Sequence, residues 1–168
     1  MNAVTPDWNQ IVEKHGTRVF RVAMRILGSI PDAEDVAQET FVEAYRLHRL
    51  EPIQSWTGLL VRLSTFRALD ALRRRRPTVE LLIEDCASHS QPIDTMVAAE
   101  LASRLRQSVS SLPEQQAAVF VLTCYEQWSR DEIAVHLGIT PESVSTSLYK
   151  ARKQLANLLN LYNPGELS

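Results

Sequence analysis

Residues 129–144 read SRDEIAVHLGITPESV and predict two short helices joined by a tight turn. Ser129 is a favoured N-cap residue, and Glu132 stands three positions later, where its side chain can complete a capping box. Gly138 can adopt the left-handed conformation that ends a helix. Thr140 caps a second helix, which the following proline opens at its first helical position. The pattern therefore predicts one helix over 130–137 and another starting at 141.

The apolar residues of this stretch indicate how the two helices pack. Ile133 and Leu137 face the core, and Ala134 is small enough for the second helix to cross closely. Ile139 and Val144 fill the angle between the helices. This is the logic of a helix-turn-helix, in which the second helix enters the major groove of DNA. A generic helix pair joined by glycine is the alternative.

The exposed side of the second helix supplies the candidate contacts to DNA. Its N-terminal residues are the ones that approach base edges in such a motif, while lysines farther along contact phosphates. Serine and threonine discriminate weakly between bases. The candidates are Glu142, Ser143, Ser145, Thr146, Tyr149, Lys150 and Lys153.

The rest of the chain is also helical in pattern, so the expected fold class is all-α. Apolar spacing predicts helices over 7–27, from Pro31 to about His48, from Ser55 to the arginine run, over 94–109 and over 114–125. Gly28 is the expected C-cap of the first helix. The expected buried stripe of the third helix is Trp56, Leu59, Leu60, Leu63, Phe66, Leu69 and Leu72.

A change of composition divides the chain into two small helical domains. Residues 77–92 are acidic and polar and lie between two prolines, which is typical of a flexible linker. The expected domains are therefore 1–76 and 93–168.

Composition excludes several classes of protein. No apolar run reaches the roughly 18 residues that a membrane span needs, and the N-terminus lacks a signal-peptide pattern, so we expect a cytoplasmic protein. The two cysteines and four histidines form no ligand spacing, and no phosphate loop or nucleophile motif occurs. We expect no metal, no cofactor and no enzymatic activity. The net charge of −2 predicts weak binding to DNA without a larger partner.

Two blocks in order resemble the extracytoplasmic-function sigma factors of the sigma-70 family. The first is DAEDVAQETF at 32–41, followed by the helix ending DALRR at 70–74; it resembles region 2 of the family. The second runs from Leu112-Pro113 through the helix-turn-helix to 152 and resembles region 4. The resemblance covers nearly the whole chain. It implies a subunit that directs RNA polymerase to promoters and that an anti-sigma factor controls.

The resemblance assigns a role to each part of region 2. Asp35, Gln38 and Glu39 are expected to dock on the clamp helices of the polymerase beta-prime subunit, because a row of acceptors suits basic side chains. Region 2 is then expected to read the melted −10 element, with cations on the phosphates. The residues implied for −10 DNA are His48, Arg49, Gln54, Trp56, Arg62, Arg67, Arg73, Arg74, Arg75 and Arg76.

Region 4 is implied to bind the −35 element and the polymerase beta flap. The recognition helix departs from the family here, because it reads VSTS at 144–147 where the family favours Val-Lys-Ser-Arg. Phe66 also stands where members usually carry Asn. The net negative charge of region 4 and its Ser-rich recognition helix leave a second reading open, in which the protein mimics a sigma factor and sequesters an anti-sigma factor without touching DNA.

Overall fold

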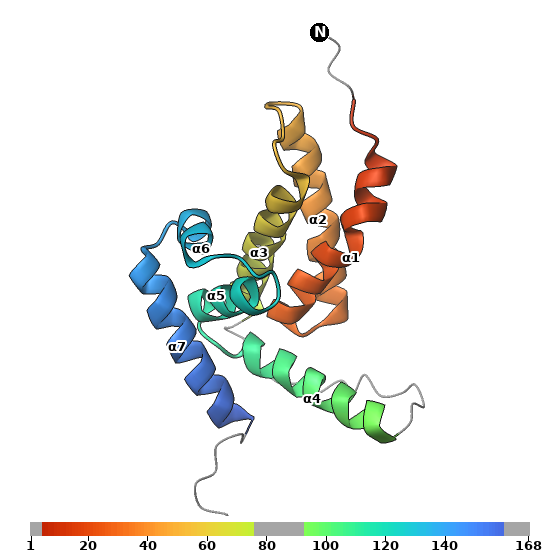
Figure 1. The fold of residues 1–168 in the computed structure, drawn as a ribbon. Coiled ribbons are helices and arrows are strands. Elements are labelled where there is room, and N and C mark those ends of the chain that lie inside the picture. Colours follow the sequence, from red (N-terminus) through yellow and green to blue (C-terminus); the bar gives the residue numbers. More distant parts are fainter. Residues whose placement is uncertain (1–4, 76–92, 160–168) are drawn as a thin grey trace, which may run out of the picture.

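The computed structural model describes residues 5–75 and 93–159, which form an all-helical fold (Figure 1). The helices are α1 (Trp8–Leu27), α2 (Ile30–His48), α3 (Trp56–Arg75), α4 (Ile93–Ser110), α5 (Glu114–Cys124), α6 (Arg130–Leu137) and α7 (Pro141–Leu158). The predicted all-α class is confirmed. The predicted linker at 77–92 and Arg76 lie outside the described residues. Within the described ranges, no helix combines the length and apolar character that crossing a membrane requires.

The first three helices pack against one another as a bundle. Asp7 caps α1, and Gly28 ends it with φ +66°, as its position in the sequence predicts. Ser29 caps α2, so that helix begins at Ile30 and Pro31 occupies its second position, one later than predicted. Proline is tolerated there because the N–H groups of a first helical turn have no partner within the helix.

The buried face of α3 differs from the predicted stripe. Leu60, Leu69 and Leu72 are buried, but Phe66 lies on the outside with 37% of its surface exposed. Ser64 and Thr65 are buried instead. Burial of these hydroxyls is tolerated because each is hydrogen-bonded. Ser64 donates to the Val19 carbonyl of α1 at 2.9 Å, and Thr65 donates to the carbonyl four residues back at 2.8 Å.

The predicted helix-turn-helix is present as α6 and α7, and its boundaries match the prediction. Ser129 and Glu132 form the full capping box, and Gly138 has φ +65°. The hydroxyl of Thr140 accepts from the backbone of Ser143 at 3.1 Å, which caps α7. Local capping chemistry therefore sets both ends of the turn.

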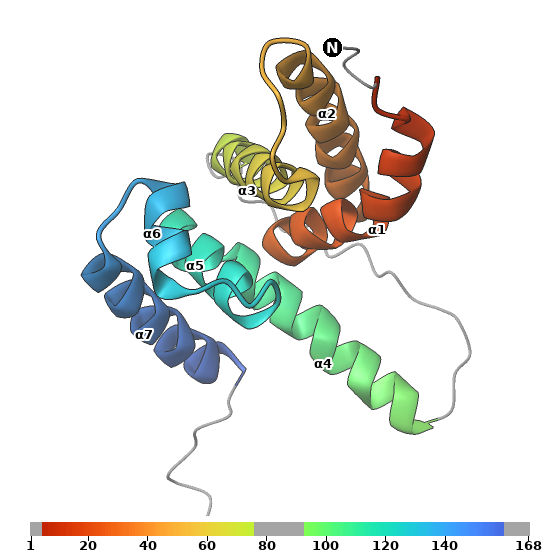
Figure 2. The same cartoon turned by 45° about the horizontal axis from the view of Figure 1, so that its top comes forward.

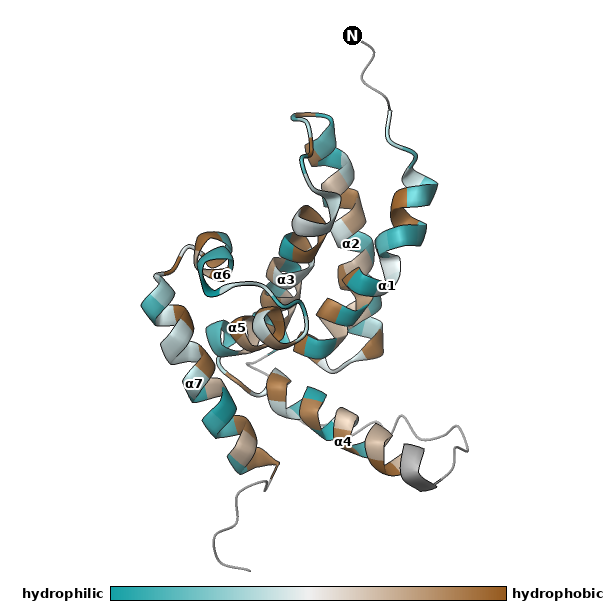
Figure 3. Ribbon diagram, in the orientation of Figure 1, coloured by the Kyte–Doolittle hydropathy of each residue, from teal (hydrophilic) through white to brown (hydrophobic). Residues whose placement is uncertain are grey.

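The two predicted domains pack together in this structure. One apolar cluster includes Val22, Ile26 and Leu27 of α1 together with Leu112 and Leu122 near and on α5. Figure 2 shows α4 and α5 beneath the α1–α3 bundle. Figure 3 shows hydrophobic residues alternating with hydrophilic ones along the coloured part of α4. The domain limits themselves stay a prediction.

One substitution tests the close crossing in the helix-turn-helix. Ala134 is 5% exposed, whereas the next residue, Val135, is 79% exposed. We expect Ala134→Leu to lower the free energy of unfolding by about 1–3 kcal/mol, because the added methyl groups overpack the site. Val135→Leu is the matched control and should change it by less than about 0.5 kcal/mol. Urea unfolding followed by circular dichroism measures both, and equal effects would contradict the packing.

Candidate docking and nucleic-acid interfaces

An acidic groove runs between α2 and α3. The predicted docking residues Asp35, Gln38 and Glu39 are all exposed and lie together in it. They come together because residues three and four positions apart share a face of a helix. The full lining is Asp35, Gln38, Glu39, Val42, Glu43, Arg46 and Arg67. Val42 and Arg67 were not assigned to this surface from the sequence.

Arg67 lies in the acidic groove, although the sequence placed it among contacts to −10 DNA. Its Nη1 is 3.7 Å from Glu39 Oε2, and its Nη2 is 3.5 Å from Glu43 Oε2. Arg62, on another side of α3, lines a different groove. The contact of Arg67 with DNA therefore stays a prediction, while its position in this structure is beside the carboxylates of the acidic groove.

Four aromatic rings gather where α1 begins and α2 ends, and we call them the aromatic cluster: Trp8, Tyr45, His48 and Trp56. The Trp8 ring centroid lies 5.1 Å from that of Tyr45, 5.0 Å from His48 and 5.3 Å from Trp56. These spacings are typical of stable edge-to-face contacts. His48 and Trp56 are predicted −10 residues, and the structure brings them together. Sequence reasoning missed Trp8 and Tyr45, although Tyr45 precedes His48 by three positions on the same helix.

The connection between α2 and α3 carries other predicted −10 residues. Arg49 and Gln54 are exposed. Gln54 lines a groove whose walls come from 51–55, 57–59 and Arg62 on one side and from Trp128, Glu132 and His136 on the other. The pKa of His136 is lowered by burial and by Arg62, while Glu132 opposes the shift. This groove places the connection opposite α6 of the second domain.

The arginine run has partners within the chain. Arg73 binds Glu114 of α5 through two parallel hydrogen bonds, Nε–Oε1 at 2.9 Å and Nη2–Oε2 at 2.7 Å. Arg75 donates to the Leu27 carbonyl at 2.9 Å and also pairs with Asp32. Arg74 Nε lies 3.4 Å from the Asp70 carbonyl. Contact of these arginines with phosphate stays a prediction, and for Arg73 and Arg75 it requires an exchange of partners.

The recognition helix α7 presents most of its predicted residues to solvent. Glu142, Ser145, Thr146, Tyr149, Lys150 and Lys153 are exposed, and Ser143 is half-buried at the cap. Ser147 is different, because it is only 6% exposed and accepts a hydrogen bond from Gln115 Nε2 at 2.8 Å. The exposed face is suited to contacts with DNA, while Ser147 belongs to the packing between α5 and α7.

Family models match both halves of the chain in order. The sigma-70 region 2 model matches residues 11–78, and the sigma-70, region 4 model matches residues 102–155. The ECF RNA polymerase sigma factor SigE of Mycolicibacterium smegmatis is 34% identical over 162 residues, which cover 94% of this chain and 63% of that protein. The chain therefore belongs to the extracytoplasmic-function sigma factors of the sigma-70 family.

Solved structures share the fold. CnrH in complex with the cytosolic domain of CnrY superposes with a TM-score of 0.66 at 25% identity, covering 93% of this chain and 89% of that one. The sigma factor RpoE in complex with the anti-sigma factor NepR, from Bartonella quintana, gives a TM-score of 0.70 at 17% identity, covering 95% and 100%. Within this fold, residues 11–78 match the region 2 model and residues 102–155 match the region 4 model, and these parts of the chain are called region 2 and region 4 below.

Proposed function

We propose that this protein binds core RNA polymerase and directs it to specific promoters. The observation that carries the proposal is the acidic groove, with Asp35, Gln38 and Glu39 exposed side by side on region 2, in the same chain as the helix-turn-helix of region 4. One surface binds RNA polymerase and another binds DNA. The protein contributes binding and positioning, while polymerase supplies the catalysis. We place this activity in the cytoplasm.

The acidic groove is the proposed docking site for the clamp helices of the beta-prime subunit. Asp35 and Glu39 supply negative charge at its exposed edge, and such complementary charge speeds association and fixes orientation. Val42, which is 54% exposed, adds an apolar contact within the groove. An apolar centre with a charged rim is the usual anatomy of a protein interface.

The aromatic cluster and the connection after α2 form the proposed −10 reader. Aromatic rings stack on unpaired bases, and each stack contributes about 1–3 kcal/mol to binding of single strands. His48 and Trp56 lie in the cluster, and Arg49 and Gln54 are exposed beside it. Tyr45 is 45% exposed, which makes it available to a base in addition to the residues predicted from the sequence.

The exposed face of α7 is the proposed −35 reader. Ser145, Thr146 and Tyr149 lie near its N-terminus, where a recognition helix meets base edges. Lys150 follows Tyr149 directly and Lys153 lies one turn beyond Tyr149, and both lysines are proposed to contact phosphates. The first two turns carry no cation, so we propose that polymerase, including contact between region 4 and the beta flap, supplies much of the affinity.

We propose control by an anti-sigma factor. RpoE, which shares this fold, was solved in complex with the anti-sigma factor NepR, and CnrH, which also shares it, was solved in complex with the cytosolic domain of CnrY. A partner of this kind is proposed to cover the docking groove or the DNA readers until it is released.

Run-off transcription with purified core polymerase tests the proposed function. We expect transcripts from a subset of genomic fragments when this protein is added, and none with core polymerase alone. Absence of any specific transcript, together with tight binding to an anti-sigma factor, would instead favour the mimic. The observation that favours the mimic as a second candidate function is the absence of cations in the first two turns of α7.

A further inference from the structure

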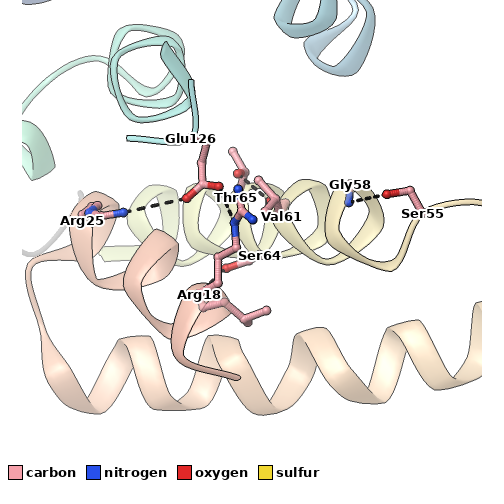
Figure 4. Close-up of polar contacts among 9 residues, drawn as sticks. Arg18, Arg25, Ser55, Gly58, Val61, Ser64, Thr65 and Glu126 are labelled. Carbon is pink, nitrogen blue, oxygen red and sulfur yellow. Dashed lines mark hydrogen bonds and ion pairs between the residues drawn. The ribbon is translucent and has the colours of Figure 1, made fainter. Parts of the chain in front are cut away.

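A buried carboxylate joins the two regions. Glu126 lies between α5 and α6, and its side chain is only 3% exposed. Its Oε2 accepts from Arg18 Nε at 2.7 Å, and its Oε1 lies 3.8 Å from Arg25 Nη1 (Figure 4). Both arginines belong to α1 in region 2. A buried carboxylate needs such partners, because removal from water strongly disfavours its charge. Two arginines of region 2 therefore compensate the negative charge of the buried Glu126 carboxylate in region 4.

The neighbouring residue strengthens the same contact. The guanidinium of Arg25 lies 4.0 Å from the ring centroid of Tyr125, which is a cation–π geometry. Burial lowers the pKa of Arg25, and Tyr125 and Glu126 oppose that shift. Arg25 thus exchanges part of its hydration for contacts with two consecutive residues of region 4.

A second contact joins the regions elsewhere. Arg73 holds Glu114 through the two parallel hydrogen bonds described above. At the end of α1, a Cβ placed on Gly28 would lie 3.4 Å from the Arg106 carbonyl oxygen of α4, so the two backbones approach closely. The apolar cluster that includes Leu27 and Leu112 fills the space between the regions. The closed arrangement therefore combines charge pairs with a continuous core.

This closed arrangement cannot place both readers on one promoter. The connection after α2 and helix α6 line a single groove. The longest helices among the described residues, α1 and α3, have 20 residues each, which corresponds to a length of about 30 Å. Promoter elements centred near −10 and −35 lie roughly 25 base pairs apart, or about 85 Å along B-form DNA at ~3.4 Å per base pair. Regions 2 and 4 must separate before each reader meets its element.

We propose that Glu126, held by Arg18 and Arg25, is a latch that keeps regions 2 and 4 closed in the free protein and opens on promoter engagement. The latch is a property of the free chain. Its consequence for transcription rests on the proposed function. Breaking the latch shifts the population toward the open form without altering any residue assigned to polymerase or DNA.

Small-angle X-ray scattering of the full chain tests the latch directly. A compact chain of 168 residues has an expected radius of gyration of about 15 Å. We expect Glu126→Arg to raise the measured radius above that of the wild type by roughly a quarter, because three cations would then face one another. Asp131→Arg is the matched control; Asp131 is also an acid in region 4, and its side chain is 80% exposed.

Variants on α1 keep the test valid if Glu126→Arg disturbs region 4. Arg18→Glu/Arg25→Glu should open the chain from the other side, and combining it with Glu126→Arg should restore the wild-type radius. Circular dichroism should report unchanged helix content throughout. The latch is wrong if both the single and the double variant remain as compact as the wild type, or if the triple variant fails to close again.

Run-off transcription then separates the latch from the proposed function. We expect Glu126→Arg to reach half-maximal transcription at a lower protein concentration than the wild type. The two ideas can fail separately. If Glu126→Arg opens in scattering but neither it nor the wild type supports any transcript, the latch stands and the proposed sigma activity is refuted.

Discussion

The double charge reversal Asp35→Lys/Glu39→Lys is expected to raise the dissociation constant for core RNA polymerase by about a hundredfold or more. Truncating one partner of a buried charge pair at an interface typically costs roughly 2–5 kcal/mol, and tenfold corresponds to about 1.4 kcal/mol. Reversal adds repulsion to that loss. Both side chains are exposed in the acidic groove, so the cost falls on binding.

The fold should survive this reversal. Asp35 has no ion-pair partner among the described residues, and Glu39 has only the half-exposed pair with Arg67 at 3.7 Å. Exposed pairs of this kind contribute about 0–1 kcal/mol to stability. Circular dichroism and thermal unfolding should therefore resemble those of the wild type.

The matched control makes the same change of net charge elsewhere. Glu13 on α1 and Glu100 on α4 are exposed and lie outside the acidic groove. Glu13→Lys/Glu100→Lys should bind core polymerase within about threefold of the wild type, since screening limits charge effects beyond about 10 Å. Fluorescence anisotropy of labelled protein titrated with core polymerase measures both. Equal loss of affinity in the two double variants would refute the groove as the docking site.

Features set by neighbouring residues could be predicted from the sequence. The boundaries of α6 and α7 follow from caps at Ser129, Gly138 and Thr140, each of which acts within one turn of its own position. The acidic groove was predictable in part for the same reason, because helical spacing alone brings Asp35 and Glu39 to one face. Arg67 was not, since it reaches the groove from another helix.

Features that depend on packing between distant segments were not predictable. The stripe predicted for α3 included Phe66, but the buried side of that helix is set by contact with α1, where the Val19 carbonyl accepts from Ser64. The packing of region 4 against region 2 had no local signal either. In the sequence, Glu126 is an ordinary charged residue after α5. Its side chain is buried against Arg18, which lies 108 positions away in the sequence, so no local pattern indicates the burial.

Two substitutions that place a cation in α7 are expected to give opposite results. The resemblance sets Lys at 145 and Arg at 147, but here Ser145 is exposed and Ser147 is buried. Ser147→Arg must bring a guanidinium between α5 and α7, where the Ser147 hydroxyl now meets Gln115. We expect a loss of about 3 kcal/mol or more, from overpacking and from burial of a charge. Because the two domains pack together, we take the chain of 168 residues as the unfolding unit, and this loss then lowers the melting temperature by about 6–12 °C.

In contrast to Ser147→Arg, Ser145→Lys should leave the free energy of unfolding unchanged and should strengthen binding to DNA. The new cation projects from the exposed face one turn before Tyr149, within reach of phosphate. One added phosphate contact steepens the dependence of log affinity on log salt by about 0.9. Holoenzyme titrated against promoter DNA at several salt concentrations measures this slope, and differential scanning calorimetry measures stability.

Ser147→Ala, which only leaves the Gln115 amide without its acceptor, should cost about 1 kcal/mol. A Ser147→Arg protein that melts like the wild type would show that position 147 is open to solvent and that α7 packs differently on α5.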